Sequence, residues 1–167
     1  PYAPNMITQE ILRKYLSYDP LTGIFIWAVN SGRHGRIKAG TIAGCLTFYG
    51  YTKILLCGEQ ILAHRLAWFY VNGSWPIGQI DHINCIKTDN RIINLRDVTR
   101  GINQQNKITH QFNNKLGFLG VSKQRNKYVA CIHTYGKTKY IGTYETPELA
   151  HAAYVKEKRK THAGCTL

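Results

Sequence analysis

The adjacent pair Asp81-His82, in the stretch QIDHIN at 79–84, has side chains suited to hydrolytic chemistry. Carboxylates are scarce in this chain, which has nine Asp and Glu residues against twenty-two Lys and Arg. A carboxylate can bind a divalent cation, and a neutral histidine beside it can take a proton from water. The same pair could instead make only local hydrogen bonds in a turn, so its meaning depends on its neighbours.

Two asparagines follow the pair at a spacing that supports the chemical interpretation. Asn94 lies twelve residues after His82, and Asn103 lies twenty-one residues after it. A strand, a loop, a second strand and a helix in that order could bring Asp81, His82 and Asn103 together. Asp81 and the amide oxygen of Asn103 would then be two ligands of a Mg²⁺ ion, with His82 as general base. Asn94 would accept the second imidazole N–H, or it would only brace the loop.

Apolar periodicity predicts short helices and strands around the pair. Residues 8–16 predict an amphipathic helix with Thr8 as its N-cap, and residues 65–73 predict a second one that ends at Gly73. A third helix is expected at 99–107. Strands are expected at 24–29, 51–56, 60–65 and 94–99.

The C-terminal part of the chain predicts a separate module. Residues 109–116 are polar and indicate a linker. Alternating strands at 127–133 and 139–144 follow, joined by a turn, and a helix at 146–160 begins with Thr146 as N-cap and a proline at its first position. This pattern indicates a small sheet with one packed helix.

The formal net charge of +13 predicts a polyanionic partner, because each Lys or Arg placed on a phosphate releases condensed counterions. We expect double-stranded DNA. Near the pair, Arg65 could contact phosphate or pair with a carboxylate. The candidate DNA-binding residues are Arg65, Arg91, Arg125, Lys127, Lys137 and Lys139.

Other classes are disfavoured. No apolar run approaches the roughly 18 residues of a membrane-spanning helix. The five cysteines are scattered without a CxxC pair, which argues against a zinc ribbon and suits a reducing cytoplasm. We therefore expect a cytoplasmic protein with no membrane partner and no organic cofactor.

Four short motifs resemble the HNH nuclease family. They are HRLAWFY at 64–70, IDHIN at 80–84, DNRIINLRDVT at 89–99 and NQQN at 103–106. The resemblance is closest to the phage and homing branch, in which Asn replaces the last histidine of the name. It implies the ββα-metal fold, with His82 as general base and Asn94 orienting it. It places the metal ligands at Asp81 and Asn103, holding one Mg²⁺ or Mn²⁺ ion per active site. A glycine that frequently follows the second motif is Cys85 here.

The segment 119–154 resembles the AP2 DNA-binding domain, which lays a three-stranded sheet into the major groove and supports it with a helix. The matches are Gly120-Val121, Tyr128, Ala130, Ile132, Tyr140-Ile141-Gly142, Glu148, Ala150, Ala153 and Tyr154. Tryptophans typical of AP2 sheets are absent, and Tyr128 stands at one such place. The resemblance implies that this segment binds DNA, without indicating which bases it contacts.

The expected fold class is α+β. The expected parts are an N-terminal helix and β-rich region at 6–59, a nuclease core at 60–108, the linker at 109–116 and an AP2-like domain at 117–167. The expected function is metal-dependent cleavage of duplex DNA by a phage-encoded enzyme in its host cell. One site would nick, and a double-strand break would need a homodimer or a second encounter. The alternative is a non-catalytic DNA-binding regulator that keeps the scaffold.

Overall fold

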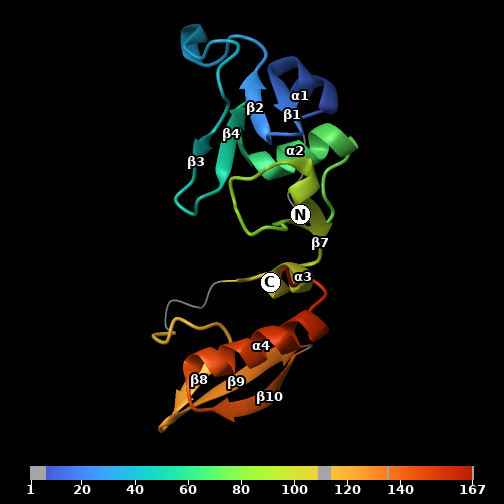
Figure 1. Ribbon diagram of the computed structural model, residues 1–167. Helices are drawn as coiled ribbons and strands as arrows, with labels where there is room; N and C mark the ends of the chain where they lie inside the picture. Colours follow the sequence, from blue (N-terminus) through green and yellow to red (C-terminus); the bar gives the residue numbers. More distant parts are fainter. Residues whose placement is uncertain (1–6, 109–113, 135, 167) are drawn as a thin grey trace. The chain divides into compact units, whose positions relative to one another are not determined.

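The computed structural model describes residues 7–108, 114–134 and 136–166. By its internal contacts the chain divides into two compact units, the first ending at Thr99 and the second beginning at Arg100. Figure 1 labels the elements of each unit.

The first unit begins with a helix and a hairpin. These are α1 (Gln9–Tyr15), β1 (Leu16–Asp19) and β2 (Ile24–Trp27). Thr8 caps α1 as predicted, because its hydroxyl accepts the N–H of Ile11 at 3.2 Å. The predicted helix included Leu16, but this residue begins β1 and is paired with Trp27. Its side chain is fully buried, so the strand is favoured by packing.

A three-stranded antiparallel sheet and a second helix follow. The one-turn helix η1 (Arg33–Gly35) precedes β3 (Cys45–Leu46), β4 (Thr52–Leu56), β5 (Glu59–Leu62) and α2 (Ala63–Asn72). The sheet has the order β3-β4-β5. The predicted hairpin is confirmed, but the strand predicted at 60–65 ends at Leu62, and residues 63–65 begin α2 instead. The turn residues Cys57 and Gly58 both have positive φ, as a two-residue hairpin turn requires. Gly73 ends α2 in the left-handed conformation at φ 72°, as predicted.

The core of the first unit joins its three described sheets to the helices. Phe69 of α2 stacks on Trp75 with ring centroids 4.2 Å apart. The buried apolar residues are Ile7, Leu12, Leu16, Tyr18, Phe25, Trp27, Ala43, Ile54, Leu56, Ile61, Ala63, Leu66, Ala67, Phe69, Ile80 and Leu95. Because Ile80 and Leu95 belong to this cluster, the hairpin that bears the Asp-His pair is packed on the N-terminal elements.

That hairpin consists of β6 (Gln79–His82) and β7 (Leu95–Val98), which pair antiparallel. The connecting loop, residues 83–94, ends in the 3-10 turn η2 (Ile92–Asn94). The strand predicted at 94–99 is therefore confirmed as β7.

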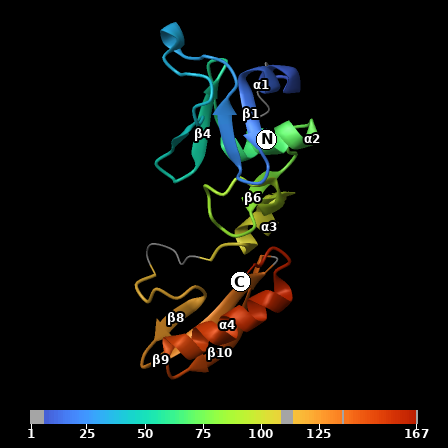
Figure 2. The ribbon, with the colours of Figure 1, turned by 45° about the horizontal axis from the view of Figure 1, so that its top comes forward.

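The second unit contains a short helix, a sheet and a long helix. These are α3 (Arg100–Gln105), β8 (Val121–Gln124), β9 (Lys127–Thr134), β10 (Lys137–Tyr144) and α4 (Pro147–Thr161). The sheet is antiparallel in the order β10-β9-β8, and α4 lies along one face of it (Figure 2). The hydroxyl of Thr146 caps α4 through the N–H of Leu149, and Pro147 begins the helix, as predicted.

The strand register divides the second sheet into a covered face and an open face. Val121, Ala130 and Ile132 are buried with Ala150 and Tyr154 of α4, so they define the covered face. Side chains alternate along a strand, so neighbouring positions point away from α4. The open face therefore carries Ser122, Gln124, Lys127, Val129, Cys131, His133, Thr138, Tyr140 and Thr143.

The small helix α3 is packed within the second unit. Gln105 accepts the backbone N–H of Gly164 at 3.2 Å, and the buried Lys158 donates to the carbonyl of Lys107 at 2.5 Å. Asn106 and Thr166 are also hydrogen-bonded through their side chains. The C-terminal segment after α4 thus holds the helix that carries Asn103.

The mixed α+β class expected from the sequence is confirmed, with helices and strands close to their predicted positions. The division at Thr99 falls inside the predicted range 60–108, and part of the predicted linker lies outside the described residues. The predicted domain boundaries stay a prediction. None of the described helices is both long and apolar enough to cross a membrane.

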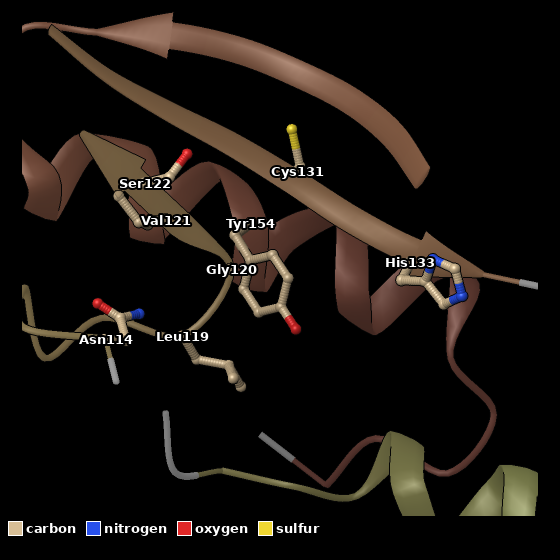
Figure 3. Close-up of a pocket in the computed structure, with 8 residues that line it drawn as sticks. All are labelled: Asn114, Leu119, Gly120, Val121, Ser122, Cys131, His133 and Tyr154. Carbon is tan, nitrogen blue, oxygen red and sulfur yellow. The ribbon is translucent and has the colours of Figure 1, made fainter. Parts of the chain in front are cut away.

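Gly120 provides a test of how the second unit packs. A Cβ at this position would lie 2.0 Å from the ring of Tyr154, which Figure 3 shows beside it. We predict that Gly120→Ala destabilises the unit by roughly 3 kcal/mol or more, measured by urea unfolding followed by circular dichroism. Gly117→Ala is the matched control, because Gly117 has a similar φ of 76° but open space around its Cβ. Its cost should be only about 1 kcal/mol, and equal losses would contradict the packing argument.

Candidate functional site

The β6–β7 hairpin places Asp81 and His82 at the end of β6. Asp81 is paired with Arg96 across the hairpin, and His82 with Leu95. The two side chains are only 6% and 5% exposed. Burial of a carboxylate and an imidazole is costly unless each has a partner, so their contacts define the site.

Asp81 has a cationic partner on the neighbouring strand. Oδ2 of Asp81 accepts from Nη2 of Arg96 at 2.7 Å and from Nε at 2.8 Å. The cross-strand register sets this pair, because directly opposed side chains on one face lie within contact distance. Arg96 therefore neutralises the buried carboxylate in this structure.

His82 has its tautomer set by a hydrogen bond. Nε2 lies 3.1 Å from Oδ1 of Asn90, whose side chain is also buried. An amide oxygen can only accept, so Nε2 donates and the neutral ring carries its lone pair on Nδ1. Burial lowers the pKa of His82, although the Asn90 hydrogen bond and the nearby Asp81 and Asp89 charges oppose this effect. The ring is therefore neutral near pH 7.

Asn94 holds the loop between the strands. Its Nδ2 donates to the carbonyl of Asp89 at 2.8 Å and to Oδ1 of Asn84 at 2.9 Å, while its Oδ1 accepts the N–H of Asn84 at 3.0 Å. The hydrogen bond to His82 that the sequence predicted from Asn94 is made by Asn90. Asn94 instead fixes the carbonyl immediately before Asn90.

Asn90 is also positioned from the N-terminal region. The hydroxyl of Tyr18, in β1, donates to its carbonyl oxygen at 2.7 Å. A Cβ at Gly23 would lie 2.4 Å from the N of Arg91, so a glycine lets the β1–β2 turn approach the loop closely. Sequence reasoning missed Asn90 as a site residue. Its place within the motif at 89–99 was the available signal, but nothing in the sequence distinguished it from Asn94.

The loop contains a backbone position suited to glycine. Cys85 has φ 60°, in the left-handed region. This conformation explains why the resembling family frequently has glycine there, since a side chain costs roughly 1 kcal/mol or more in that region. Asp89 and Arg91 pair at 2.6 Å in the same loop, and Arg91 is the main cause of lowering the pKa of Asp89 to about 2.

Two more rings line the site beside His82. The ring of His64, in α2, is edge-to-face with that of His82 at 5.1 Å, and the ring of Tyr51 lies 6.0 Å from His82. His64 is buried, and its Nδ1 has no hydrogen-bond partner. Burial, with smaller effects of His82 and Arg65, lowers the pKa of His64 to about 3. Sequence reasoning connected neither His64 nor Tyr51 to the site as a neighbour of His82.

The other predicted residues lie in several places. Asn103 is in α3, in the second unit, and its pairing with Asp81 stays a prediction. Arg65 is partly buried in α2, where burial lowers its pKa and the charge of Asp97 opposes this. Arg91 remains partly exposed beside Asp89.

The four predicted basic residues of the second unit do not all lie on the same face of its sheet. Arg125 lies in the β8–β9 turn, and Lys127 follows the register of the open face, where it pairs with Glu145 at 2.9 Å. Lys137 and Lys139 follow the register of the covered face. Lys139 binds Glu157 of α4 at 2.7 Å, which agrees with that placement.

A shallow cavity of about 350 Å³ lies within the second unit (Figure 3). Its lining residues are Asn114, Leu119, Gly120, Val121, Ser122, Cys131, His133 and Tyr154. It contains none of the residues that the sequence predicted as catalytic or metal-binding, so it is separate from the candidate site.

The residues at the candidate site are compatible with a hard cation. Within the described ranges, no group of three or more His, Cys, Asp or Glu side chains could hold a metal ion. A site rich in nitrogen or sulfur ligands is therefore absent from those residues. Mg²⁺ commonly needs only one or two carboxylates, with water and substrate phosphate as the other ligands. The single buried carboxylate of Asp81 fits that requirement.

His64 should make the first unit sensitive to acid. Its folded pKa of about 3 lies below the usual 6.5, so between these values the unfolded state binds the extra proton. We predict that stability falls as pH falls below about 6.5, by up to about 1.4 kcal/mol per pH unit from this residue. His64→Phe should reduce that slope in urea unfolding followed by tryptophan fluorescence. An exposed-histidine control, His133→Phe, should keep the parent slope; an unchanged slope in His64→Phe would contradict the assignment.

Comparison with known proteins identifies one domain. The family model described as HNH endonuclease matches residues 62–105, about a quarter of the chain. No curated protein and no solved structure matches the chain. The matched range contains α2, β6, β7 and α3, together with the loop that holds Asn90 and Asn94. This segment of the chain is therefore similar to an HNH endonuclease domain, which supports a nuclease acting on DNA.

Proposed function

We propose that the protein is a metal-dependent HNH endonuclease that hydrolyses phosphodiester bonds in duplex DNA, by nicking or double-strand cleavage. The observation that carries the proposal is the state of His82. It is buried, its Nε2 is bound to Asn90, and it follows Asp81 directly along β6. A neutral imidazole with a defined tautomer is what a general base for water requires.

In the proposed reaction, Nδ1 of His82 takes a proton from a water molecule as its oxygen attacks phosphorus. The bond from phosphorus to the 3′-oxygen breaks on the opposite side. Asn90 keeps Nε2 as donor, and it can stabilise the imidazolium once Nδ1 has gained the proton. Asn94 acts through the loop, because its amide fixes the carbonyl of Asp89 next to Asn90.

Asp81 and Asn103 are the proposed ligands of one Mg²⁺ or Mn²⁺ ion. A bound cation would stabilise negative charge on the phosphate and on the leaving oxygen. Arg96 contributes to this arrangement, because it binds Oδ2 of Asp81 and holds the carboxylate in one orientation before DNA arrives. The oxygen-only ligand set favours these ions over softer metals.

The proposed DNA-targeting part is an AP2-like module at residues 117–167, within the second unit. Its open face carries hydroxyl, amide, amine and imidazole groups on the side of the sheet away from α4, as a surface that contacts base edges and phosphates requires. The excess of basic residues after residue 106, eleven against three acidic, gives this unit a strong attraction for polyanions. The remaining expectations, a phage origin, a homing role and a homodimer for double-strand cleavage, stay part of the proposal.

The alternative is a DNA-binding regulator that keeps the HNH scaffold without cleaving. The buried and hydrogen-bonded His82 favours the enzyme, because a scaffold alone does not need a buried imidazole beside a carboxylate.

Replacing His82 separates these two functions. We predict that His82→Ala lowers the rate of nicking of supercoiled plasmid with Mg²⁺ by about 10²–10⁴-fold, while affinity for duplex DNA is kept. In the parent, the cleavage rate should fall as the pH falls through the lowered pKa of His82, because the protonated ring cannot act as a base. Above about pH 6.5 His82 is already neutral, so it should cause no further change in rate. His34→Asn, at an exposed histidine of η1, should cut like the parent.

Two outcomes would overturn the assignment. Nicking by His82→Ala at the parent rate would exclude His82 as the base. DNA binding by the parent with no cleavage in Mg²⁺ or Mn²⁺ would favour the regulator.

The two faces of the second sheet predict unequal roles for its lysines. Lys127→Gln should weaken binding to duplex DNA and lower the slope of log affinity against log salt by about one, because an open-face phosphate contact is lost. Lys139→Gln should change binding less, since this residue follows the covered face and binds Glu157. Binding titrations at several salt concentrations test this order, and a larger effect of Lys139→Gln would contradict it.

A further inference from the structure

The turn that joins β3 to β4 exposes two aromatic rings. Phe48 is 97% exposed and Tyr49 is 74% exposed, and their rings are edge-to-face at 5.5 Å. We call residues 47–51 the hairpin tip. Neither ring belongs to the core of the first unit, so the packing of this unit does not explain two aromatic side chains at an exposed turn.

The hairpin tip is held by its own hydrogen bonds. Thr47 N donates to the carbonyl of Tyr51 at 2.7 Å, and Tyr51 N donates to the hydroxyl of Thr47 at 3.1 Å. Gly50 has φ 81° and donates to the carbonyl of Thr47 at 2.9 Å. A closed turn of this kind fixes the direction of its exposed side chains, so a partner would meet preorganised rings.

The hairpin tip is connected to the candidate active site. Lys87, in the loop after β6, donates to the carbonyl of Tyr49 at 3.0 Å and lies over the ring of Tyr51 at 5.0 Å. The ring of Tyr51 in turn lies 6.0 Å from His82. Figure 1 shows the β3–β4 turn on the same side of the unit as this loop. Phe48 is only three residues from Tyr51 along the chain, so the hairpin tip lies near His82.

The charge around the hairpin tip suits a polyanion. Residues 20–58 contain no Asp or Glu, and Lys53 of β4 follows the tip by two residues. Lys87 adds a further cation beside the tip itself. Exposed aromatic rings among cations, without carboxylates, are complementary to stacked bases between phosphates.

We propose that the hairpin tip is a second DNA contact, at which Phe48 and Tyr49 stack on or insert between bases close to the cleaved phosphate. Apolar side chains that enter a base step unstack it and widen access to the backbone. The hairpin tip thereby helps to place the scissile phosphate at His82. This inference rests on the proposed nuclease function and adds to it a contact outside the matched residues 62–105.

The test compares Phe48→Ala/Tyr49→Ala with the parent on duplex DNA without metal and on supercoiled plasmid with Mg²⁺. Affinity for DNA should fall by about tenfold for each ring lost. The salt slope should be unchanged, because no phosphate contact is removed. Folding should be unaffected, since both rings are exposed. Ile77→Ala is the matched control, with a side chain that is 87% exposed and lies before β6, and it should bind like the parent.

Phe48→Trp provides a direct readout of stacking. This variant keeps a ring at the hairpin tip, so we expect parent-like affinity and cleavage. The introduced indole is exposed in the free protein, and duplex DNA should quench its fluorescence beyond the change seen for the parent, which has three tryptophans.

Three results would overturn the inference. The double alanine variant could bind and cut like the parent, or the introduced indole could show no added quenching on DNA that is bound. Light scattering could also show that the parent is a dimer and the double alanine variant a monomer. The rings would then bind a second copy of the chain and not DNA. Failure of the parent itself to bind or cut DNA would instead refute the proposed function, and this inference with it.

Discussion

The hydrogen bond between His82 Nε2 and Asn90 Oδ1 is the constraint on which the candidate site depends. It satisfies a buried imidazole and selects its tautomer, and it does so only while Asn90 stays in place. Asn94 fixes the preceding carbonyl, and Tyr18 of β1 donates to the carbonyl of Asn90 itself. The pKa of Tyr18 is raised to about 12, mainly by burial, so this donor keeps its proton throughout the neutral range. The N-terminal elements therefore position the loop of the HNH-like segment.

The two proposed metal ligands lie on elements that are stabilised in different ways. Asp81 is set by the β6–β7 register and its pair with Arg96. Asn103 lies on α3, which is only six residues long and would be marginal by itself. The second unit supports α3 through the contacts of Lys158 and Gly164. Contacts within the second unit thus stabilise the helix that carries Asn103.

Positive charge gives the protein attraction for nucleic acid, but location decides which charges are useful. Several basic side chains have structural partners: Arg96 binds Asp81, Arg91 binds Asp89 and Lys139 binds Glu157. These pairs orient carboxylates or fasten a helix. Lys127 and the hairpin tip lie on surfaces that a duplex could meet, which is why a count of basic residues overstates the number of DNA contacts.

The sequence by itself determined the elements whose signals are local. Thr8, Gly73 and Thr146 mark helix ends through hydrogen bonds or a backbone conformation within a few residues, and the alternation at 127–133 predicts a strand for the same reason. It also indicated the Asp-His pair, because adjacency and motif spacing are visible in one dimension. The tertiary structure alone decided that Asn90 binds His82, that His64 and Tyr51 border it, and that Lys139 lies on the covered face. These outcomes depend on strand register and on contacts between segments distant in sequence, which local propensity does not encode.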